Sequence, residues 1–453
     1  MRKPNSDLIP LARLGIVTDL YQLTMANGYL AFNKEDEIAT FDLFVRKLPE
    51  NRSYLMVCGL ESALHYLTTV RFTEEDIDLL RDKPVFRNAK EEFWDYLSDF
   101  KFTGDVWAMP EGSISFGNEP LMIVKAPLIE AQIVETYLLT CYSHQTKIAS
   151  KAARCVEAAK NTPIIEFGMR RTDIGAATRG AKAAYVGGCV GTSNVMAEAL
   201  FGIPSFGTQA HSWIMSFESE EEAFAAYFQI YGSETIALID TYDNLQGARS
   251  AAKLSGSIKG IRLDSGDMTE ISKIVREILD IADKKEAIIF ASSDLNEYKI
   301  EKMLKNGAKI DGWGVGTELI LSRDAPTLGS VYKLVSLEKE GKTSLKLKLS
   351  KNKKTYPGFK QVYRSYNNGV PEYDILAVRG EFDNELEALL VPVIKNGKLV
   401  YVLPEISERR NYGIKNREKL SSKFRQTKAD QSYEVKISPK LDALTEETVS
   451  KLV

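Results

Sequence analysis

The sequence predicts an α/β fold, with a barrel-like domain of βα repeats between a smaller N-terminal α+β domain and a C-terminal α+β extension. Two observations predict it. In the middle of the chain, apolar runs of five or six residues alternate with amphipathic helical patterns. Before and after this region, strand-like runs occur without such alternation. Strands that alternate with helices are typical of a parallel sheet, because each parallel connection needs a crossover helix.

The pattern divides the chain into three zones, at residues 1–125, 126–330 and 331–453. The first zone predicts a helix over 18–32 and strands over 38–45, 104–109 and 114–125. The second predicts a long helix over 128–160, strands over 163–168, 235–240, 259–264, 287–292 and 309–314, and helices over 269–285 and 297–306. Weaker runs at 189–192 and 205–208 could complete the barrel. The third predicts strands over 331–337 and 344–349, a hairpin around Asn396-Gly397, and a partly helical tail.

The composition is that of a globular protein. Among 453 residues, 44% are hydrophobic and the net charge is only −3, which excludes a disordered chain. No apolar stretch approaches the roughly 18 residues of a membrane span, so no membrane partner is expected. The first residues lack the apolar core of a secretory signal. Four cysteines without a CxxC pair favour a reducing compartment, and the expected location is cytoplasmic.

The charge is distributed unevenly along the chain. Residues 331–453 hold 24 Lys and Arg against 16 Asp and Glu. Many of these lysines lie between 342 and 354, where Leu345, Leu347 and Leu349 alternate with them. Such alternation predicts a half-buried strand with a solvated basic face. Neither interleaved aromatic residues nor an RNA-binding motif accompanies the lysines, so no nucleic-acid partner is expected.

Polar side chains follow the apolar runs of the second zone, where the predicted strands end. They lie in the segments Glu166–Arg171, Asp240–Asp243, Arg262–Asp267, Ser292–Asp294 and Gly314–Thr317. In barrels of βα units the carboxyl ends of the strands carry the ligand site. Five polar ends in succession therefore predict a functional cleft at this edge.

The segment Gly314-Val-Gly316-Thr317 fits a tight strand-to-helix turn whose backbone N–H groups can hold a phosphate. Asp264 and Asp267 could hold ribose hydroxyls or a Mg²⁺ ion, and Asp267 could equally cap the helix that follows.

Arginines complete this set of candidates. Arg170, Arg171 and Arg262 could bind phosphates or a carboxylate through paired hydrogen bonds, and Asp294 is a candidate by its strand-end position. Together, these residue types suggest a sugar substrate that bears several phosphates.

Of three histidines, His211 is the best candidate for chemistry. His65 and His144 lie in helical, largely apolar contexts, whereas His211 follows Gly207-Thr208-Gln209-Ala210 after a short apolar run. Small neighbours leave its ring accessible for a nucleophilic or proton-transfer role. No G-x-S-x-G elbow, H-E-x-x-H motif or Cys/His cluster occurs, so neither a serine hydrolase nor a zinc site is expected.

An ordered set of blocks resembles the nicotinate phosphoribosyltransferase family. The blocks are Thr18–Met25, Glu166–Arg171, Gly207–Ser212, Arg262–Asp267, Gly314–Thr317, Ser330–Val335 and Tyr356–Arg364. The resemblance implies the type II phosphoribosyltransferase fold, with a TIM-like barrel beside a smaller N-terminal domain. It also implies a homodimer with shared active sites. Some family members carry a C-terminal cysteine metal site; here every cysteine precedes residue 190, so none is expected.

The resemblance further implies a reaction in NAD salvage: nicotinate and phosphoribosyl diphosphate give nicotinate mononucleotide and pyrophosphate. Family members couple this to ATP hydrolysis through a phosphohistidine, with Mg²⁺, and His211 matches that position. Thr208, Arg262 and, from the neighbouring subunit, Tyr21 match nicotinate contacts, and Thr317 matches a phosphoribosyl diphosphate contact. Asp264 is expected beside His211 in the catalytic centre.

Three alternatives remain at this point: a nicotinamide phosphoribosyltransferase, a quinolinate phosphoribosyltransferase, and a non-catalytic phosphate-sensing barrel. The first would recognise a neutral amide and the second a dicarboxylate. The Tyr21 and Gly207–Ser212 blocks favour nicotinate over both, and a phosphorylatable His211 disfavours pure binding.

Overall fold

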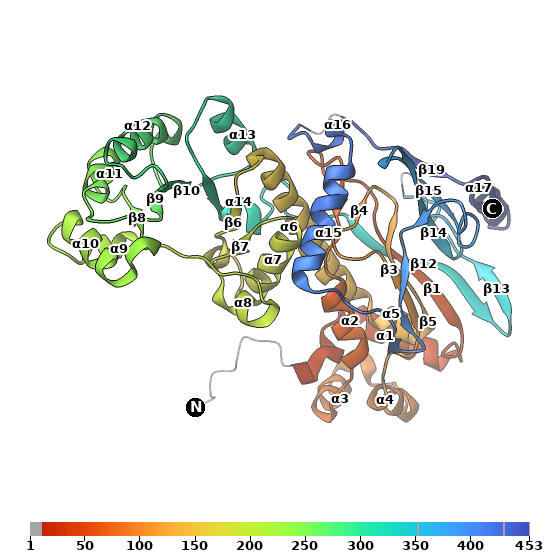
Figure 1. The fold of residues 1–453 in the computed structure, drawn as a ribbon. Helices are drawn as coiled ribbons and strands as arrows, with labels where there is room; N and C mark the ends of the chain where they lie inside the picture. Colours follow the sequence, from red (N-terminus) through yellow and green to blue (C-terminus); the bar gives the residue numbers. More distant parts are fainter. Residues whose placement is uncertain (1–10, 351–352, 429–430, 453) are drawn as a thin grey trace.

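Two large sheets organise the chain, and each has its own hydrophobic core. A computed structural model describes residues 11–350, 353–428 and 431–452 (Figure 1). The first sheet is antiparallel, in the order β13-β12-β1-β5-β3-β17-β18. Its strands are β1 (Ile38–Val45), β3 (Asp105–Ala108), β5 (Pro120–Pro127), β12 (Ser330–Lys339), β13 (Lys342–Leu345), β17 (Val391–Lys395) and β18 (Lys398–Leu399).

The second sheet has six parallel strands in the order β7-β6-β11-β10-β9-β8. The strands are β6 (Ile164–Glu166), β7 (Gly191–Thr192), β8 (Ile236–Leu238), β9 (Gly260–Leu263), β10 (Ile288–Ala291) and β11 (Gly312–Val315). They are almost continuously buried, because helices cover a parallel sheet. The predicted parallel α/β sheet is therefore confirmed.

A parallel bridge from Thr192 to Ser205 extends this sheet beyond β7. Among the described residues, no ladder joins this end to β8. Closure of the sheet into a barrel therefore stays a prediction.

Helices follow the parallel strands as the alternating pattern predicts. They are α7 (Ile174–Val186), α8 (Val195–Phe201), α9 (His211–Met215), α10 (Glu220–Tyr231), α11 (Asn244–Ala252), α12 (Met268–Ile281), α13 (Glu297–Lys305) and α14 (Thr317–Ile320). Three of these helices, α11, α12 and α13, begin a few residues after a strand ends. Each is capped by the side chain of the residue before it: Asp243, Asp267 and Asn296, respectively. This places helix N-termini around the carboxyl edge of the sheet.

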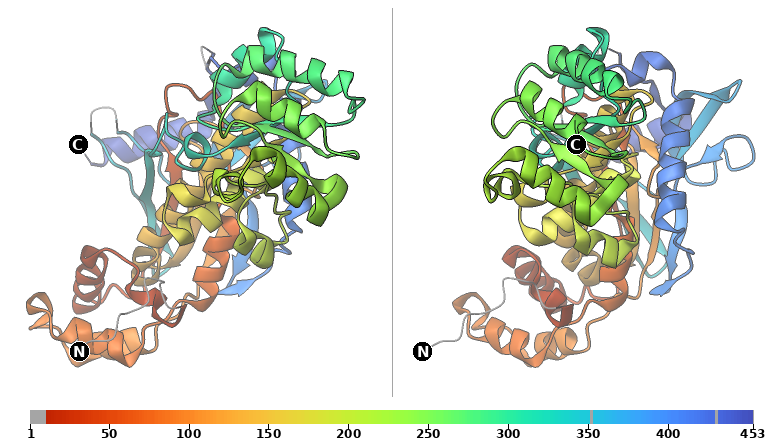
Figure 2. Two further views of the ribbon diagram at one scale, coloured as in Figure 1. Left: turned by 90° about the vertical axis from the view of Figure 1, so that its left-hand side faces the viewer. Right: turned by 60° about the vertical axis from the view of Figure 1, so that its left-hand side comes forward.

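Among the described residues, four α-helices belong to the N-terminal zone: α1 (Leu20–Ala31), α2 (Leu60–Thr69), α3 (Glu74–Arg81) and α4 (Glu91–Ser98). Of these, α3 and α4 lie at the far end of the molecule from α12 in both turned views (Figure 2). The helix expected over 18–32 is α1, whose N-cap residue, Asp19, makes no capping hydrogen bond through its side chain. The hydroxyl of Thr18 donates to the carbonyl of Ile133 at 3.3 Å. The helix expected over 128–160 is interrupted at Val134, giving α5 (Leu128–Ile133) and α6 (Glu135–Ala159).

The C-terminal zone forms a further sheet and three helices. The sheet, in the order β16-β14-β15-β19, contains β14 (Lys360–Asn367), β15 (Val370–Val378), β16 (Glu387–Ala388) and β19 (Val435–Ile437), while β2 (Leu55–Met56) pairs with β4 (Ile114–Ser115) elsewhere. The helices are α15 (Ile406–Lys419), α16 (Ser422–Arg425) and α17 (Pro439–Ser450). The partly helical tail and the hairpin around Asn396-Gly397 are confirmed. The lysine-faced strand is shorter and more exposed than expected: β13 ends at Leu345, which is its one partly buried residue, so the prediction of a half-buried strand over 344–349 is wrong. Residues 351–352 of that run lie outside the described residues.

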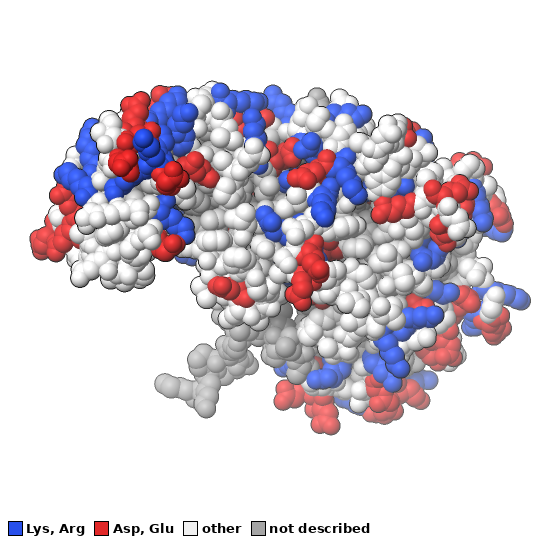
Figure 3. Space-filling view, viewed as in Figure 1, with Lys and Arg blue, Asp and Glu red and all other residues white. Residues whose placement is uncertain are grey.

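The first and third zones of the sequence share one sheet. β12 pairs with β1 along the whole of β1, and β17 pairs with β3. The chain therefore leaves this sheet after β5, forms the parallel sheet, and returns to pair with it. The zone boundaries at 125 and 330 remain predictions, but the outer two zones are not separate in space. Charged side chains crowd both ends of the molecule, whereas its centre shows few (Figure 3).

Buried ion pairs connect the two units. Lys151 of α6 is fully buried, and its Nζ lies 2.5 Å from Glu297 and 2.9 Å from Asp324. Asp324 in turn accepts two hydrogen bonds from Arg52, which precedes β2. Burial alone would raise the pKa of Glu297, but Lys151 and Arg154 hold that pKa below its ordinary value. Removing one partner would leave a buried charge uncompensated.

We expect Lys151→Met to lower the free energy of unfolding by about 3 kcal/mol, because Glu297 and Asp324 would lose their shared cation. Urea denaturation followed by circular dichroism at pH 7 would measure this. The control is Lys451→Met, which breaks an exposed pair with Glu447 and should leave the midpoint unchanged. Equal midpoints for both variants would contradict the prediction.

Candidate active site

Five strand ends meet at the carboxyl edge of the parallel sheet. Because β6, β8, β9, β10 and β11 all run in one direction, the residues that follow them gather at this edge. β9 supplies Arg262 and is followed by Asp264, β10 is followed by Ser292, and β8 by Asp240 and Thr241. The predicted cleft is thus built from segments far apart in sequence.

Arg262 is the centre of this cluster. Its Nε donates to the Ser292 hydroxyl at 2.7 Å, and its terminal nitrogens donate to Thr208 Oγ1 and Asp264 Oδ1, each at 3.0 Å. The guanidinium carbon lies 5.8 Å from the centroid of the Phe167 ring. The side chain is only 17% exposed. Its fixed fork therefore joins three segments and presents a positive charge to the cleft.

Asp264 is held in its ionised form. Burial raises the pKa of this carboxyl, but the hydrogen bond from Ser292, the charge and hydrogen bond of Arg262 and the nearby His211 outweigh it, and the pKa is lowered. The carboxylate therefore keeps its negative charge at neutral pH.

His211 begins α9 and lies beside two carboxylates. Its Nδ1 is 3.1 Å from the hydroxyl of Thr241. Its Nε2 is 3.9 Å from both Asp240 Oδ1 and Asp264 Oδ2. The ring is 42% exposed. If Nδ1 carries the proton and donates it to Thr241, Nε2 keeps a free lone pair on the open side.

The same three side chains could hold a cation. One ligand atom from each of His211, Asp240 and Asp264 lies within 4.8 Å of the others. Asp240 Oδ1 is buried and accepts no hydrogen bond, while its Oδ2 accepts one from Ser265 at 2.6 Å. Carboxylate oxygens are the ligands that Mg²⁺ prefers, so Asp240 and Asp264 fit the expected ion, whereas the imidazole nitrogen of His211 is not a typical Mg²⁺ ligand.

A cavity of about 320 Å³ opens next to Arg262. Its lining contains Phe167, Met169, Arg170, Ser193, the segment Phe206–Ala210 and Arg262. An aromatic ring, a hydroxyl and a guanidinium suit a small planar anion. Three candidates from the sequence, Arg170, Thr208 and Arg262, thus line one cavity.

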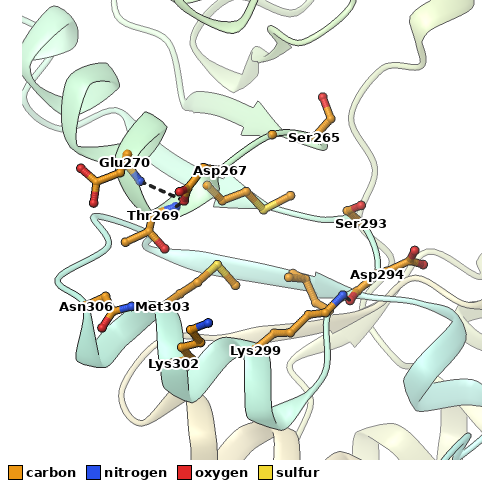
Figure 4. A pocket seen from close by; sticks show the side chains of 13 residues that line it. Ser265, Asp267, Thr269, Glu270, Ser293, Asp294, Lys299, Lys302, Met303 and Asn306 are labelled. Carbon is orange, nitrogen blue, oxygen red and sulfur yellow. Dashed lines mark hydrogen bonds between the residues drawn. The ribbon is translucent and has the colours of Figure 1, made fainter.

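A second hollow, of about 410 Å³, lies between α12 and α13 (Figure 4). Asp267 and Asp294 line it, and Lys302 of α13 lies across it from Asp267. Lys299 points to the other side, where its Nζ donates to the carbonyl oxygen of Asp294 at 2.6 Å. Asp267 Oδ1 accepts the N–H groups of Thr269 and Glu270 at 3.1 and 3.4 Å. Its carboxylate therefore caps α12. Among the described residues, Asp267 does not belong to the cluster of His211, Asp240 and Asp264 that could hold a cation.

The remaining candidates from the sequence lie outside the cluster of Arg262, Asp264 and His211. Arg171 is exposed in the turn after β6, and Gly316 and Thr317 follow β11 at the same edge of the sheet. At Gly316 a Cβ would lie 3.0 Å from the carbonyl oxygen of Phe167, so the turn needs its small residue. Tyr21 lies on α1 of the N-terminal unit, 50% exposed, away from α9 (Figure 1). One chain therefore does not bring Tyr21 to His211.

Sequence reasoning assigned no role to Asp240, Thr241 or Ser292, although Asp240 and Ser292 end predicted strands. Their strand-end position was the available signal. Periodicity does not tell which side chains face each other across neighbouring strands. Their contacts with His211 and Arg262 emerge only once the strands are paired.

The fold and this cluster define an α/β protein with a small-molecule site at the carboxyl edge of a parallel sheet. Family models agree with that class and narrow it. The nicotinate phosphoribosyltransferase N-terminal domain matches residues 16–143, the family itself 163–369 and its C-terminal domain 382–445. The chain therefore belongs to the nicotinate phosphoribosyltransferase family.

Individual relatives agree with this membership. A nicotinate phosphoribosyltransferase of Bacillus subtilis is 39% identical over 459 residues, which cover 94% of this chain and 93% of that protein. One of Mycobacterium tuberculosis is 43% identical over 394 residues, covering 85% and 82%. The crystal structure of human nicotinic acid phosphoribosyltransferase superposes with a TM-score of 0.83 at 25% identity, covering 95% of this chain and 99% of that one. None of the described helices is long and apolar enough to cross a membrane.

The capping role of Asp267 can be separated from a metal role. We expect Asp267→Ala to lower the free energy of unfolding by about 1 kcal/mol, because α12 loses its N-cap. Asp267→Asn should keep the cap and full stability, since asparagine caps equally well. Chemical denaturation of both variants, with and without Mg²⁺, measures this. A Mg²⁺-dependent stabilisation that both variants lose would instead make Asp267 a ligand.

Proposed function

We propose that the chain transfers the phosphoribosyl group of phosphoribosyl diphosphate to nicotinate, forming nicotinate mononucleotide and pyrophosphate, and couples this step to ATP hydrolysis. The reaction would be a step of NAD salvage, as the family resemblance implies. The observation that carries the proposal is the position of Arg262, which joins the cavity to the His211 carboxylate cluster. Family membership and the names of the relatives support the same activity.

The cavity beside Arg262 is the proposed nicotinate site. Nicotinate is a planar anion, so the guanidinium of Arg262 and the hydroxyl of Thr208 suit its carboxylate, and Phe167 suits its ring. The pyridine nitrogen is itself the nucleophile that attacks the anomeric carbon. No protein base is required to activate it, in keeping with the lack of a catalytic triad motif in the sequence.

Phosphoribosyl diphosphate would lie along the strand ends. Arg170, Arg171 and the Gly316-Thr317 turn could bind its phosphates, and Asp294 its ribose hydroxyls. Bond breaking at the anomeric carbon develops positive charge on the sugar and negative charge on the departing pyrophosphate. Asp264 is ionised and close to Arg262, so it could steady the sugar while the arginines neutralise the leaving group.

His211 is the proposed phosphate acceptor. Its Nε2 would attack the terminal phosphorus of ATP, forming an N–P bond as the P–O bond to ADP breaks. Hydrolysis of the phosphohistidine would then release phosphate. Asp240 and Asp264 lie 3.9 Å from Nε2, and their negative charge would repel an incoming phosphate. Mg²⁺ bound by Asp240 and Asp264 would supply the charge neutralisation that this phosphate needs.

Replacing His211 tests the ATP coupling. We expect His211→Ala to form nicotinate mononucleotide slowly, with no stimulation by ATP and no ATP hydrolysis, because the acceptor nitrogen is gone. Product and phosphate release are measured with phosphoribosyl diphosphate, ATP and nicotinate, nicotinamide or quinolinate in turn. His65→Ala, at an exposed position of α2, is the control. Undiminished ATP stimulation in His211→Ala would overturn the coupling, and turnover of another pyridine would change the substrate.

A homodimer with shared sites is part of the proposal. Tyr21 lies on α1, apart from the cluster, so in a shared site it would come from the partner subunit. Large apolar side chains are exposed beside the cleft: Ile174 on α7, and Val195, Met196 and Leu200 on α8, each at least 52%. Exposed apolar patches of this kind are typical of subunit interfaces.

Mixing inactive variants tests the shared site. Tyr21→Ala and His211→Ala are expected to be deficient separately and to recover about a quarter of wild-type activity when refolded together in equal amounts. Half of the dimers are then mixed, and each mixed dimer has one intact site. Product formation measures the recovery. A mixture no more active than the average of its components would contradict a site shared between subunits.

A further inference from the structure

Glu166, the last residue of β6, uses both carboxylate oxygens inside the protein. It is fully buried. Its Oε1 accepts the backbone N–H of Gly168 in a short hydrogen bond, and its Oε2 accepts the hydroxyl of Thr192 at 2.7 Å. The carboxylate therefore joins the turn after β6 to the neighbouring strand β7.

The hydrogen bonds continue from Thr192 into two helices. Thr192 Oγ1 accepts the N–H of Asn194 at 3.1 Å. Asn194 caps α8 through its side-chain oxygen, and its amide nitrogen donates to Thr178 of α7 at 3.3 Å. All of these side chains are buried. Each donor or acceptor has its partner, which is the condition under which a buried polar network stabilises one geometry.

The turn that Glu166 holds forms one wall of the Arg262 cavity. Phe167, Met169 and Arg170 line that cavity, and so does Ser193, which follows β7. The turn has little room to move: a Cβ at Gly168 would lie 2.5 Å from Ile320, and a Cβ at Gly314 would lie 2.6 Å from the Phe167 ring. β11 and α14 thus confine the turn on two sides, and the Glu166 carboxylate holds it toward β7.

We propose that Glu166 is a positioning residue, whose carboxylate holds the Phe167–Arg171 turn in the geometry that accepts nicotinate. The statement about nicotinate rests on the proposed function, whereas the statement about the turn does not. Glu166 lines neither the cavity nor the His211 cluster. It acts through Gly168, and so through the placement of Phe167 and Arg170.

The charge of Glu166 is sensitive to pH near neutrality. Burial raises the pKa of this carboxyl to about 7, although the hydrogen bonds from Thr192 and Gly168 oppose the rise. Among the described residues, no charged side chain contributes to this shift. The titratable group facing Glu166 is the buried Cys189, whose pKa burial raises well above its usual value, and Arg170 and Arg171 of the turn are exposed. Above pH 7 the ionised carboxylate makes the stronger, charge-assisted bond to Gly168.

Two substitutions test the role. Glu166→Gln keeps the shape of the side chain but not its charge, and an amide cannot accept hydrogen bonds at both terminal atoms. The matched control is Glu130→Gln. Glu130 is another buried glutamate with a raised pKa that accepts a backbone N–H and a threonine hydroxyl, both from Thr103, in the N-terminal unit. A general effect of neutralising a buried glutamate would appear in both variants.

The first measurement is the KM for nicotinate and kcat at pH 6, 7 and 8, expressed relative to Glu130→Gln, so that titration of the substrates' phosphates cancels. At pH 8 we expect Glu166→Gln to raise KM roughly tenfold with a smaller change in kcat, the equivalent of about 1.4 kcal/mol. Relative to this variant, wild-type KM should fall between pH 6 and 8. A KM and pH profile equal to those of the control would overturn the proposal.

The second measurement needs no turnover. Hydrogen exchange of the peptide that contains residues 166–171, in the unliganded protein, should be faster in Glu166→Gln than in wild type or Glu130→Gln. Unchanged exchange would overturn the positioning role, whatever the protein binds. Faster exchange in a protein that is inactive on nicotinate would leave the positioning role standing and overturn the proposed function.

The free energy of unfolding should change with pH in the opposite direction to nicotinate binding. The pKa of Glu166 is higher in the folded protein than its ordinary 4.5, so the folded state binds more protons between these values. Wild-type stability should therefore fall, relative to Glu166→Gln, as pH rises from about 4.5 through 7. Should Glu166→Gln fail to fold, Thr192→Val removes the hydrogen bond that anchors Glu166 Oε2 to β7, and Thr192→Ser retains that bond. Equal KM values for these two variants would then overturn the proposal.

Discussion

The fork of hydrogen bonds from Arg262 to Thr208, Asp264 and Ser292 is the interaction on which the site depends. It exists because β9 and β10 are parallel neighbours, with Arg262 opposite Phe290 in the register. A slip by one residue would turn Arg262 to the other face of the sheet and remove the fork. The guanidinium then links the cavity on one side to the carboxylates beside His211 on the other. One side chain thereby connects the cavity to the carboxylate cluster.

The rest of the structure keeps that register in place. The chain leaves the antiparallel sheet after β5, forms the parallel sheet, and then returns to the antiparallel sheet, where β12 pairs with β1. Buried charges such as Lys151, Glu297 and Asp324 connect the two units. A buried ion pair is a costly way to gain stability, but it tolerates few alternative arrangements. The site thus lies on a sheet whose position is held by buried contacts. Glu166 adds the hydrogen bonds that join the turn after β6 to β7.

Much of this could be predicted from the sequence, since strands and helices follow local periodicity. The runs ending at Glu166, Asp240, Asp264 and Ser292 correctly indicated strand ends that lie at one edge of the parallel sheet. Sequence patterns could not show that Asp240 faces His211, because that contact depends on how the start of α9 packs against the end of β8. Nor could they show that Asp267 Oδ1 caps α12, since an aspartate at a strand end can either cap a helix or bind a ligand. The hydrogen bonds of Glu166 could not be predicted either, because the sequence around it indicates only the end of a strand.

The sequence by itself determined the parallel βα architecture, the chemistry available at the strand ends and, through an ordered set of blocks, the family. Only the tertiary structure decided which of those groups meet. It placed Tyr21 far from His211 within one chain, joined the two ends of the chain in one sheet, and buried Glu166 beneath the Arg262 cavity. The physical reason is range: periodicity and capping act over a few residues, whereas strand pairing and burial join residues that can be hundreds of positions apart.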